Sequence, residues 1–240
     1  MSKIKICGVS FDDLRAEDAV REALIETGEP CWVATPNALM LESCRTNPEH
    51  RDLLNSASMV LPDGMGVVRA AKRQGTPLHG RTAGIDFAEK LAEAASLRGD
   101  RVFFLGGRDG VAQSAADHLK SRFPGLFVCG CYWGYFEKDG DENRRVVGMI
   151  RACRPDILFV GFGFPVQENW MRENLPLLPS VHVAVGLGGS FDVWAGKNRR
   201  APEFLRSHGL EWAWRMSQEP ARMRQIPALI RFAHHTRRGD

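Results

Sequence analysis

The sequence lacks a hydrophobic run long enough to cross a membrane. Its longest stretch without a charged side chain extends from Asn174 to Phe191 and contains two prolines, three glycines and a histidine. A transmembrane helix needs about 20 mostly apolar residues, so this stretch fits a turn, a strand and a glycine loop better. The first residues also lack the apolar segment and cleavage site of a signal peptide, and we therefore expect a cytoplasmic protein.

Cysteines at metal-binding spacing are missing too. Six cysteines are present, but Cys129 and Cys131 have no second Cys or His pair at zinc spacing. Without an export signal, we expect reduced thiols that act as small apolar side chains. The sequence therefore predicts neither a disulfide framework nor a zinc site.

What remains is the composition of a globular protein with an uneven distribution of charge. The 240 residues are 44% hydrophobic and 25% charged. A chain of this length and composition can bury a full hydrophobic core without disulfides or structural metal ions. The net charge is +3, yet residues 197–240 contain ten Lys or Arg and only four Asp or Glu. The basic character therefore belongs to the C-terminal segment.

Short apolar runs alternate with segments of helical period along most of the chain. Because parallel strands need crossover helices, this alternation predicts an α/β, Rossmann-like fold with a mostly parallel sheet and helices on both faces. The expected strands are Ile4–Val9, Cys31–Ala34, Ser58–Leu61, Arg101–Leu105, Leu126–Gly130, Asp156–Gly161 and Val181–Val185. The expected helices between them are Ala16–Thr27, Ala38–Arg45, Met65–Arg73, Ile85–Leu97, Gly110–Arg122, Glu142–Cys153 and Val166–Asn174.

The alternation stops near Trp194. Beyond it, Arg, Trp and Met gather in segments of helical period at Ala201–Ser207, Leu210–Gln218 and Pro220–His235. We therefore predict two domains, an α/β catalytic domain over residues 1–195 and a basic, Trp-containing helical appendage over residues 196–240.

Polar side chains follow two of the expected strands, at the edge where ligands of parallel sheets bind. Thr35 and Asn37 follow Cys31–Ala34, and they suit either a polar ligand or the cap of the next helix. Asp63 follows Ser58–Leu61 in a turn flanked by glycine. Its carboxylate suits either a general base or a turn residue.

An arginine and several glycine loops extend this pattern. Arg81 precedes a helix in a glycine-containing loop, which suits an anion or a nearby acid. The remaining loops suit phosphate, sugar or base contacts, although glycines also serve where two backbones approach closely. The residues singled out in them are Gly106, Gly161, Gly163, Gln167, Glu168, Gly188 and Gly189.

Together these loops resemble glycosyltransferase family 26, the WecG/TagA/CpsF family, from about residue 3 to residue 233. The stretches that carry the resemblance are Thr35–Asn37, Leu61–Gly64, Arg81–Asp86, Gly161–Glu168, Gly186–Arg200, Leu210–Trp212, Arg215 and Glu219–Pro220. The basic run after Pro220 is sparser than the family pattern, and residues 234–238 match no motif. The sequence leaves open whether residues 234–240 are ordered.

The resemblance implies an inverting, metal-independent glycosyltransferase without a cofactor. It implies a UDP-sugar donor, often of the N-acetylmannosamine type, and a polyprenyl-diphosphate-linked sugar acceptor in cell-surface polysaccharide synthesis. Asp63 would be the catalytic base with support from Thr35 and Asn37, while Arg81 and Gln167 would lie in the substrate pocket. An Asp-x-Asp, which holds a metal in many UDP-sugar enzymes, occurs only at Asp139 and Asp141, in a stretch typical of a solvated turn. Arginines such as Arg81 and Arg215 would then stabilise the negative charge of the departing UDP.

The resemblance assigns the appendage to membrane attachment, and its residue types agree. Trp212, Trp214, Arg222 and Arg224 combine aromatic surface with positive charge, as interfacial helices do. The alternative is a helix packed on the core with its arginines extended to solvent. We therefore expect a peripheral protein on the inner face of the bacterial plasma membrane.

Two alternatives stay open at this point. The same fold could use UDP-glucose or UDP-glucuronate, because a few hydrogen bonds decide sugar specificity. The chain could instead be a non-catalytic nucleotide- or nucleic-acid-binding module, although it shows no RNA-binding motif, and we expect no nucleic acid partner. The apolar appendage also makes a homo-oligomer plausible.

Overall fold

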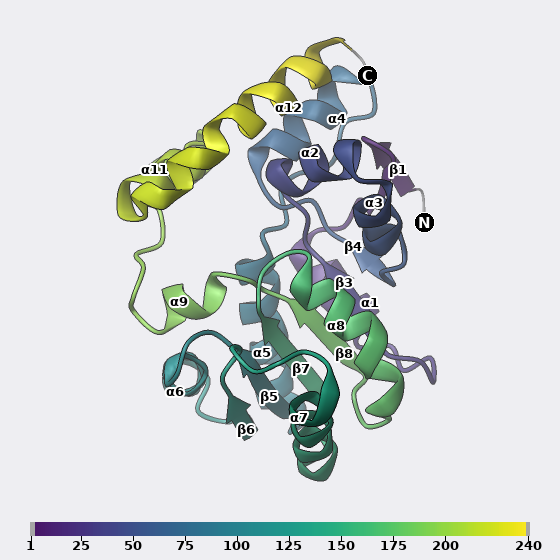
Figure 1. Cartoon of the computed structure of the whole chain (residues 1–240), viewed down its shortest axis with the longest axis vertical. Helices are drawn as coiled ribbons and strands as arrows, with labels where there is room; N and C mark the ends of the chain where they lie inside the picture. Colours follow the sequence, from purple (N-terminus) through teal and green to yellow (C-terminus); the bar gives the residue numbers. More distant parts are fainter. Residues whose placement is uncertain (1–2, 239–240) are drawn as a thin grey trace.

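A parallel β-sheet forms the centre of the protein in the computed structural model, which describes residues 3–238 (Figure 1). Its six strands within these residues run in the order β4-β3-β8-β7-β5-β6, and every neighbouring pair is parallel. The predicted α/β class with a parallel sheet is therefore confirmed. The strands are β3 (Cys31–Ala34), β4 (Met59–Val60), β5 (Arg101–Gly106), β6 (Phe127–Tyr132), β7 (Ile157–Gly161) and β8 (Val183–Gly186).

Helices cover both faces of this sheet, as predicted. Alternate side chains of β5 enter two separate cores, Val102 and Phe104 on one face and Phe103 and Leu105 on the other. Each core is closed by its own set of helices, so both faces of the sheet are buried. The first face packs against α1 (Ala16–Ala23), α5 (Gly84–Arg98), α6 (Val111–Arg122) and α9 (Ser190–Trp194). The second packs against α2 (Ala38–Thr46), α3 (Pro48–Asn55), α4 (Met65–Arg73), α7 (Gly140–Cys153) and α8 (Val166–Asn174), which the short 3₁₀ turn η1 (Leu175–Leu177) follows.

The N-terminal segment forms a hairpin instead of the predicted strand Ile4–Val9. Strands β1 (Lys3–Ile6) and β2 (Val9–Asp12) pair antiparallel in a separate sheet, with Ile6 opposite Val9. Cys7 and Gly8 between them have φ angles of 49° and 78°. Positive φ at both central residues is typical of the tight turn that matches the twist of a two-stranded ribbon. The prediction of a single strand was wrong because the sequence hides this turn. Glycine or asparagine usually occupies such positions of positive φ, but Cys7 occupies one of them here.

Helix α3 was absent from the predicted elements. Its start is clearly signalled, because Asn47 Oδ1 accepts a hydrogen bond from Glu49 N at 2.9 Å and Pro48 occupies the first helical turn. The helix is only eight residues long and has two buried leucines, Leu53 and Leu54. Its apolar period is therefore too short to be recognised in the sequence.

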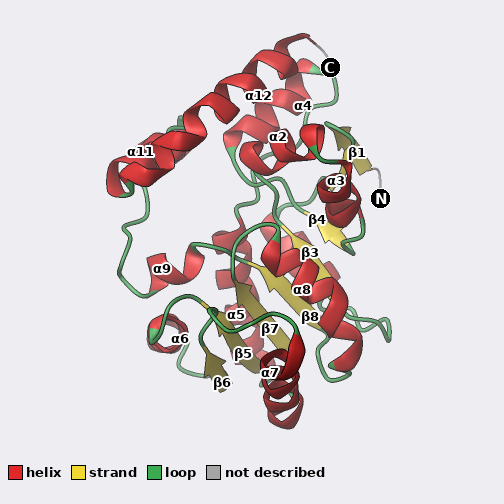
Figure 2. Cartoon of the chain, viewed as in Figure 1, coloured by secondary structure: helices red, strands yellow, loops and turns green. Residues whose placement is uncertain are grey.

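The C-terminal helices lie beyond the edge of the sheet (Figure 2). They are α10 (Glu203–Ser207), α11 (Glu211–Gln218), the 3₁₀ helix η2 (Pro220–Gln225) and α12 (Ile226–Arg238). Helix α12 packs on α2 and α4, where it buries Phe232 and where Arg231 Nε donates to Glu42 Oε1 at 3.0 Å. Residues 234–238 are thus helical, while residues 239 and 240 lie outside the described residues. The division into domains at residue 195 stays a prediction.

None of the helices between residues 3 and 238 is long and apolar enough to cross a bilayer.

Candidate active site

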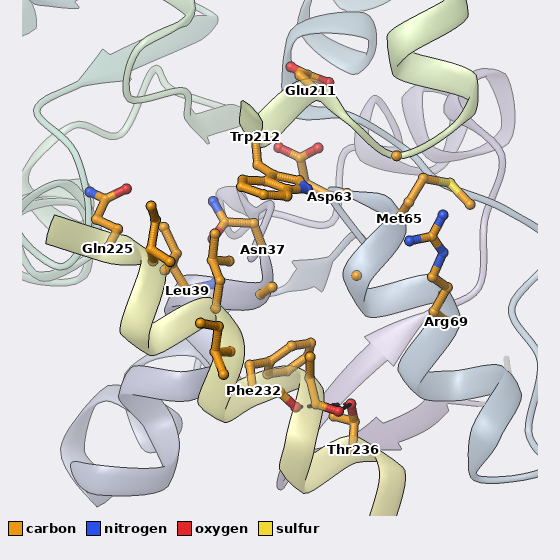
Figure 3. Close-up of a pocket in the computed structure, with 18 of the residues that line it drawn as sticks. Asn37, Leu39, Asp63, Met65, Arg69, Glu211, Trp212, Gln225, Phe232 and Thr236 are labelled. Atoms are coloured by element: carbon orange, nitrogen blue, oxygen red, sulfur yellow. Dashed lines mark hydrogen bonds between the residues drawn. The ribbon is translucent and has the colours of Figure 1, made fainter. Parts of the chain in front are cut away.

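A pocket of about 430 Å³ lies between the main fold and the C-terminal helices. Its walls come from the start of α2, from Asp63 and α4, from Arg81, and from α11, η2 and α12. Helix α11 covers the end of the pocket that contains Asp63, and α12 forms an apolar wall (Figure 3). The side chains labelled there are Asn37, Leu39, Asp63, Met65, Arg69, Glu211, Trp212, Gln225, Phe232 and Thr236.

Asp63 reaches this pocket because it stands between the end of β4 and the start of α4. Its backbone N–H donates to Pro36 O at 3.2 Å, which holds the turn against the loop after β3. The N-cap of α4 is Gly64, and no side chain caps this helix. The carboxylate of Asp63 is therefore not used as a helix cap.

Four charged side chains form one chain of ion pairs at the Asp63 end of the pocket. Arg81 Nε lies 3.4 Å from Asp63 Oδ1, and Arg81 Nη2 lies 2.6 Å from Glu211 Oε2. Arg215 Nη2 lies 2.7 Å from the other oxygen of Glu211. The side chains of Asp63, Arg81 and Glu211 are only 21%, 13% and 14% exposed, so water screens these charges weakly.

This environment shifts the pKa values of the two carboxyl groups apart. Burial raises the pKa of Asp63 above its ordinary value, Glu211 raises it further, and Arg81 and Arg215 offset part of the rise. Burial also acts to raise the pKa of Glu211, but Arg215 and Arg81 outweigh it and leave this pKa below its ordinary value. Glu211 is therefore the fixed negative charge, whereas Asp63 is the group tuned towards accepting a proton.

Thr35 and Asn37 follow the end of β3, and their surroundings differ. Asn37 Oδ1 accepts hydrogen bonds from Leu39 N at 3.0 Å and Met40 N at 3.3 Å, so its predicted role as a helix cap is confirmed. Asn37 also lines the pocket. Thr35 Oγ1 donates to Gly186 O at 3.5 Å and so contacts the end of β8. Catalytic support by either residue stays a prediction.

The glycines that end β5 and β7 lie against each other. Gly106 has a φ of 155°, and a Cβ atom there would lie 2.6 Å from the backbone of Gly161. Gly107 N also donates to Gly161 O at 3.0 Å. Close approach of two backbones thus accounts for Gly106 and Gly161, and their predicted contact with substrate stays a prediction.

Gln167 and Glu168 are buried at the start of α8. Gln167 Oε1 accepts from Gly163 N at 3.1 Å and from Gly188 N at 3.0 Å, and its Nε2 donates to Glu168 Oε1 at 2.9 Å. Burial raises the pKa of Glu168 to about 7. Gln167 therefore joins the loops after β7 and β8, and substrate binding by this pair stays a prediction.

The C-terminal arginines and tryptophans occupy different surroundings. Arg222 lines the pocket and also approaches the loop after β8, because its Nη2 lies 3.8 Å from where a Cβ of Gly189 would be. Trp212 also lines the pocket and is 47% exposed. Trp214 Nε1 instead donates to Arg199 O at 2.9 Å, and Arg224 is exposed outside the pocket.

Sequence reasoning gave no role to Glu211, which links the two arginines, or to Arg69 and Arg73 on the pocket side of α4. Glu211 stands in a stretch that carries the family resemblance, but only the fold reveals that it faces Arg81. Arg69 and Arg73 follow Met65 at four-residue spacing, which places all three on one face of the helix. This spacing could have shown from the sequence that the two arginines share a helix face with Met65.

Comparison with known proteins identifies the family of this chain. The model of the Glycosyl transferase WecG/TagA/CpsF family matches residues 4–238. A protein of Bacillus spizizenii named N-acetylglucosaminyldiphosphoundecaprenol N-acetyl-beta-D-mannosaminyltransferase is 36% identical over 208 residues, which cover 87% of this chain and 79% of that protein. Proteins of the same name from Staphylococcus aureus strains MW2 and NCTC 8325 are 30% and 31% identical, covering 97% and 95% of this chain and 91% of each relative. The chain is therefore a glycosyltransferase that belongs to the WecG/TagA/CpsF family.

Proposed function

We propose that this glycosyltransferase moves an N-acetylmannosamine-type sugar from a UDP-sugar to a hydroxyl of N-acetylglucosamine linked through a diphosphate to a polyprenol. The names of its relatives supply the two sugars and the lipid diphosphate. The observation on which the proposal depends is the carboxylate of Asp63, mostly buried in a pocket and flanked by Arg81. A single carboxylate so placed suits a direct displacement with one general base.

The proposed reaction proceeds in one step. Asp63 accepts the proton of the acceptor hydroxyl while that oxygen forms a bond with the anomeric carbon of the donor. The bond from this carbon to the UDP oxygen breaks on the opposite face, so the configuration inverts and UDP leaves with the bonding electrons. Arg215, Arg222 and the amide of Gly189 are the groups proposed to stabilise the charge that develops on the diphosphate.

We propose that the transfer needs no metal ion. The pocket offers arginines for the departing diphosphate, and Arg222 extends towards the loop after β8. The sequence's Asp-x-Asp lies elsewhere, because Asp139 precedes α7 and Asp141 is an exposed side chain paired with Arg144. These observations support guanidinium groups as the partners of the leaving group.

The function can be tested by measuring UDP release with a set of UDP-sugars and a short-chain prenyl-diphosphate-linked N-acetylglucosamine. We expect turnover to be fastest with UDP-N-acetylmannosamine and unchanged by a chelator. UDP-glucose and UDP-glucuronate serve as the competing donors. Faster turnover with either of them would replace the proposed donor, and activity that a chelator abolishes and manganese restores would exclude the metal-independent reaction.

We further propose that the C-terminal helices attach the protein to the cytoplasmic face of the plasma membrane. Several large apolar side chains of this segment are exposed, and they are interspersed with arginines, which is typical of a helix that binds a lipid surface. A lipid-linked acceptor also requires the active site to approach the bilayer. The exposed apolar residues are Phe204, Leu210, Trp212, Met223 and Ile230.

Membrane attachment predicts that polar substitutions at two of these positions weaken vesicle binding. Phe204 and Met223 are 66% and 57% exposed and lie outside the pocket, so Phe204→Ser and Met223→Ser should leave the fold and the site intact. We expect each to weaken binding to anionic vesicles by about 10- to 100-fold, since burying such a side chain is worth about 1.5–3 kcal/mol. Sedimentation with vesicles measures this.

A matched control for vesicle binding is Leu97→Ser. Leu97 is 84% exposed on α5, far from the C-terminal helices in sequence. Equal binding by all variants and the wild type would argue against the membrane role of this segment.

A further inference from the structure

The pocket has a second basic end that the proposed chemistry at Asp63 does not use. Arg69 and Arg73 from α4 and Arg237 from α12 line the same pocket as Asp63. Arg69 Nη2 donates to the backbone oxygen of His208 at 2.9 Å, and Arg73 Nη1 donates to Thr236 Oγ1 at 3.4 Å. These contacts use only one nitrogen of each guanidinium and hold it at the boundary between α4 and the C-terminal helices.

The three arginines differ in charge balance from the others in the pocket. Arg81 and Arg215 are paired with Glu211, and Arg222 is paired with Glu219. By contrast, within the described side chains, Arg69, Arg73 and Arg237 form no ion pair with a carboxylate. This end of the pocket therefore holds positive charge that a bound anion would complement, and guanidinium groups suit phosphate oxygens through paired hydrogen bonds.

The position of the arginines along α4 sets their separation from Asp63. Helix α4 begins at Met65, two residues after Asp63, and a helix rises about 1.5 Å per residue, so Arg69 and Arg73 lie about 6 and 12 Å beyond Met65 along its axis. They occupy the same face of the helix as Met65, which adjoins Asp63 in the pocket (Figure 3). This interval leaves room for a sugar ring between the carboxylate and the two arginines.

Between the two charged ends, the pocket wall is apolar. Met65 and Leu39 lie on the side of the main fold, and Phe232 and Ile230 lie on α12. Such surfaces suit the face of a sugar ring and the first carbons of a prenyl chain. The order along the pocket is thus a carboxylate, an apolar section and a cluster of guanidinium groups that pair with no carboxylate among the described side chains.

We propose that Arg69 and Arg73, with Arg237, form the subsite for the diphosphate of the lipid-linked acceptor, and that they set the distance at which its sugar hydroxyl meets Asp63. The inference rests on the proposed function for the identity of the acceptor. It assigns the two diphosphates to different arginines. Arg215 and Arg222 bind the diphosphate of the donor, and Arg69 and Arg73 bind that of the acceptor.

The test compares two acceptors that differ only in the diphosphate. One is N-acetylglucosamine joined through a diphosphate to a short prenyl chain, and the other is the glycoside of the same sugar and prenyl alcohol. For Arg69→Gln and Arg73→Gln, we expect the KM of the diphosphate acceptor to rise about tenfold each, which corresponds to ~1.4 kcal/mol. The rate with the glycoside and the KM of the UDP-sugar should stay unchanged, and Arg69→Lys should lose less than Arg69→Gln.

The control variant is Arg21→Gln, an exposed arginine on α1 at the opposite face of the sheet, which should leave both acceptors unaffected. An unchanged KM for the diphosphate acceptor, or an equal loss with both acceptors, would overturn the subsite. If the wild type transfers sugar to neither acceptor, the proposed function fails, and calorimetry with the diphosphate acceptor decides the subsite alone. Tighter binding by the wild type than by Arg69→Gln would support it, and equal binding or none would overturn it.

Discussion

Replacing Asp63 with asparagine is expected to lower kcat by about 10²–10⁴-fold, which is the usual contribution of a general base. Asparagine has nearly the same shape as aspartate but cannot accept the proton of the acceptor hydroxyl. Arg81 keeps its contact with Glu211 at 2.6 Å in this variant, so the second partner still holds it in place. The loss should therefore appear in the chemical step, and UDP release under saturating substrates measures it.

Two controls separate the loss of a base from general damage. The affinity for UDP, measured by calorimetry, should stay close to that of the wild type, because the groups proposed to hold the diphosphate belong to other segments. Asp141→Asn changes an exposed carboxylate on α7 and should keep full activity. Turnover by Asp63→Asn equal to that of the wild type would remove Asp63 from the role of base.

Sequence patterns predicted the sheet because most of its strands are short apolar runs that are buried on both faces. Val102 to Leu105 shows why this works, since both sets of alternating side chains enter a core and leave a continuous apolar signal. The same rule failed at the N-terminus, where the turn at Cys7 and Gly8 divides one apolar run into two strands. A turn of this kind depends on two backbone angles that an apolar pattern does not register.

The site was predictable where it lies at the ends of strands and unpredictable where distant helices meet it. Asp63 follows β4 directly, so its place at the sheet edge follows from the chain order. Glu211 enters the pocket only because α11 folds back over the end of the pocket that contains Asp63 (Figure 3). Sequence separations of this size leave no local signal, and only packing brings Arg81 and Glu211 together.

The dependence of activity on pH should respond in opposite directions to two substitutions beside Asp63. Arg81 lowers the pKa of Asp63 and Glu211 raises it, while burial raises it most. In the wild type, kcat/KM should therefore fall as the pH drops through a value above the ordinary carboxyl pKa. Arg81→Gln should move this limb to higher pH, because it removes a charge that lowers the pKa of Asp63, and Glu211→Gln should move it to lower pH, because it removes a charge that raises this pKa. Profiles of kcat/KM against pH measure both shifts.

Opposite shifts are the decisive feature, because structural damage alone would lower activity in both variants without moving the limbs apart. Glu203→Gln alters an exposed carboxylate paired with Arg206 and should leave the profile unchanged.

Arg81→Gln is also expected to lower the free energy of unfolding, because it leaves Asp63 and Glu211 without the cation between them. Breaking a buried ion pair costs about 3–5 kcal/mol. A carboxyl group whose pKa is raised by folding binds its proton more tightly in the folded state, so the free energy of unfolding should decrease as the pH rises from the ordinary carboxyl pKa through the raised value. Chemical denaturation across this window should therefore show Arg81→Gln approaching the wild type in acid and falling furthest below it once Asp63 is ionised. A deficit that is the same at every pH would mean that Arg81 stabilises the fold by packing alone, with no part in holding the charge of the base.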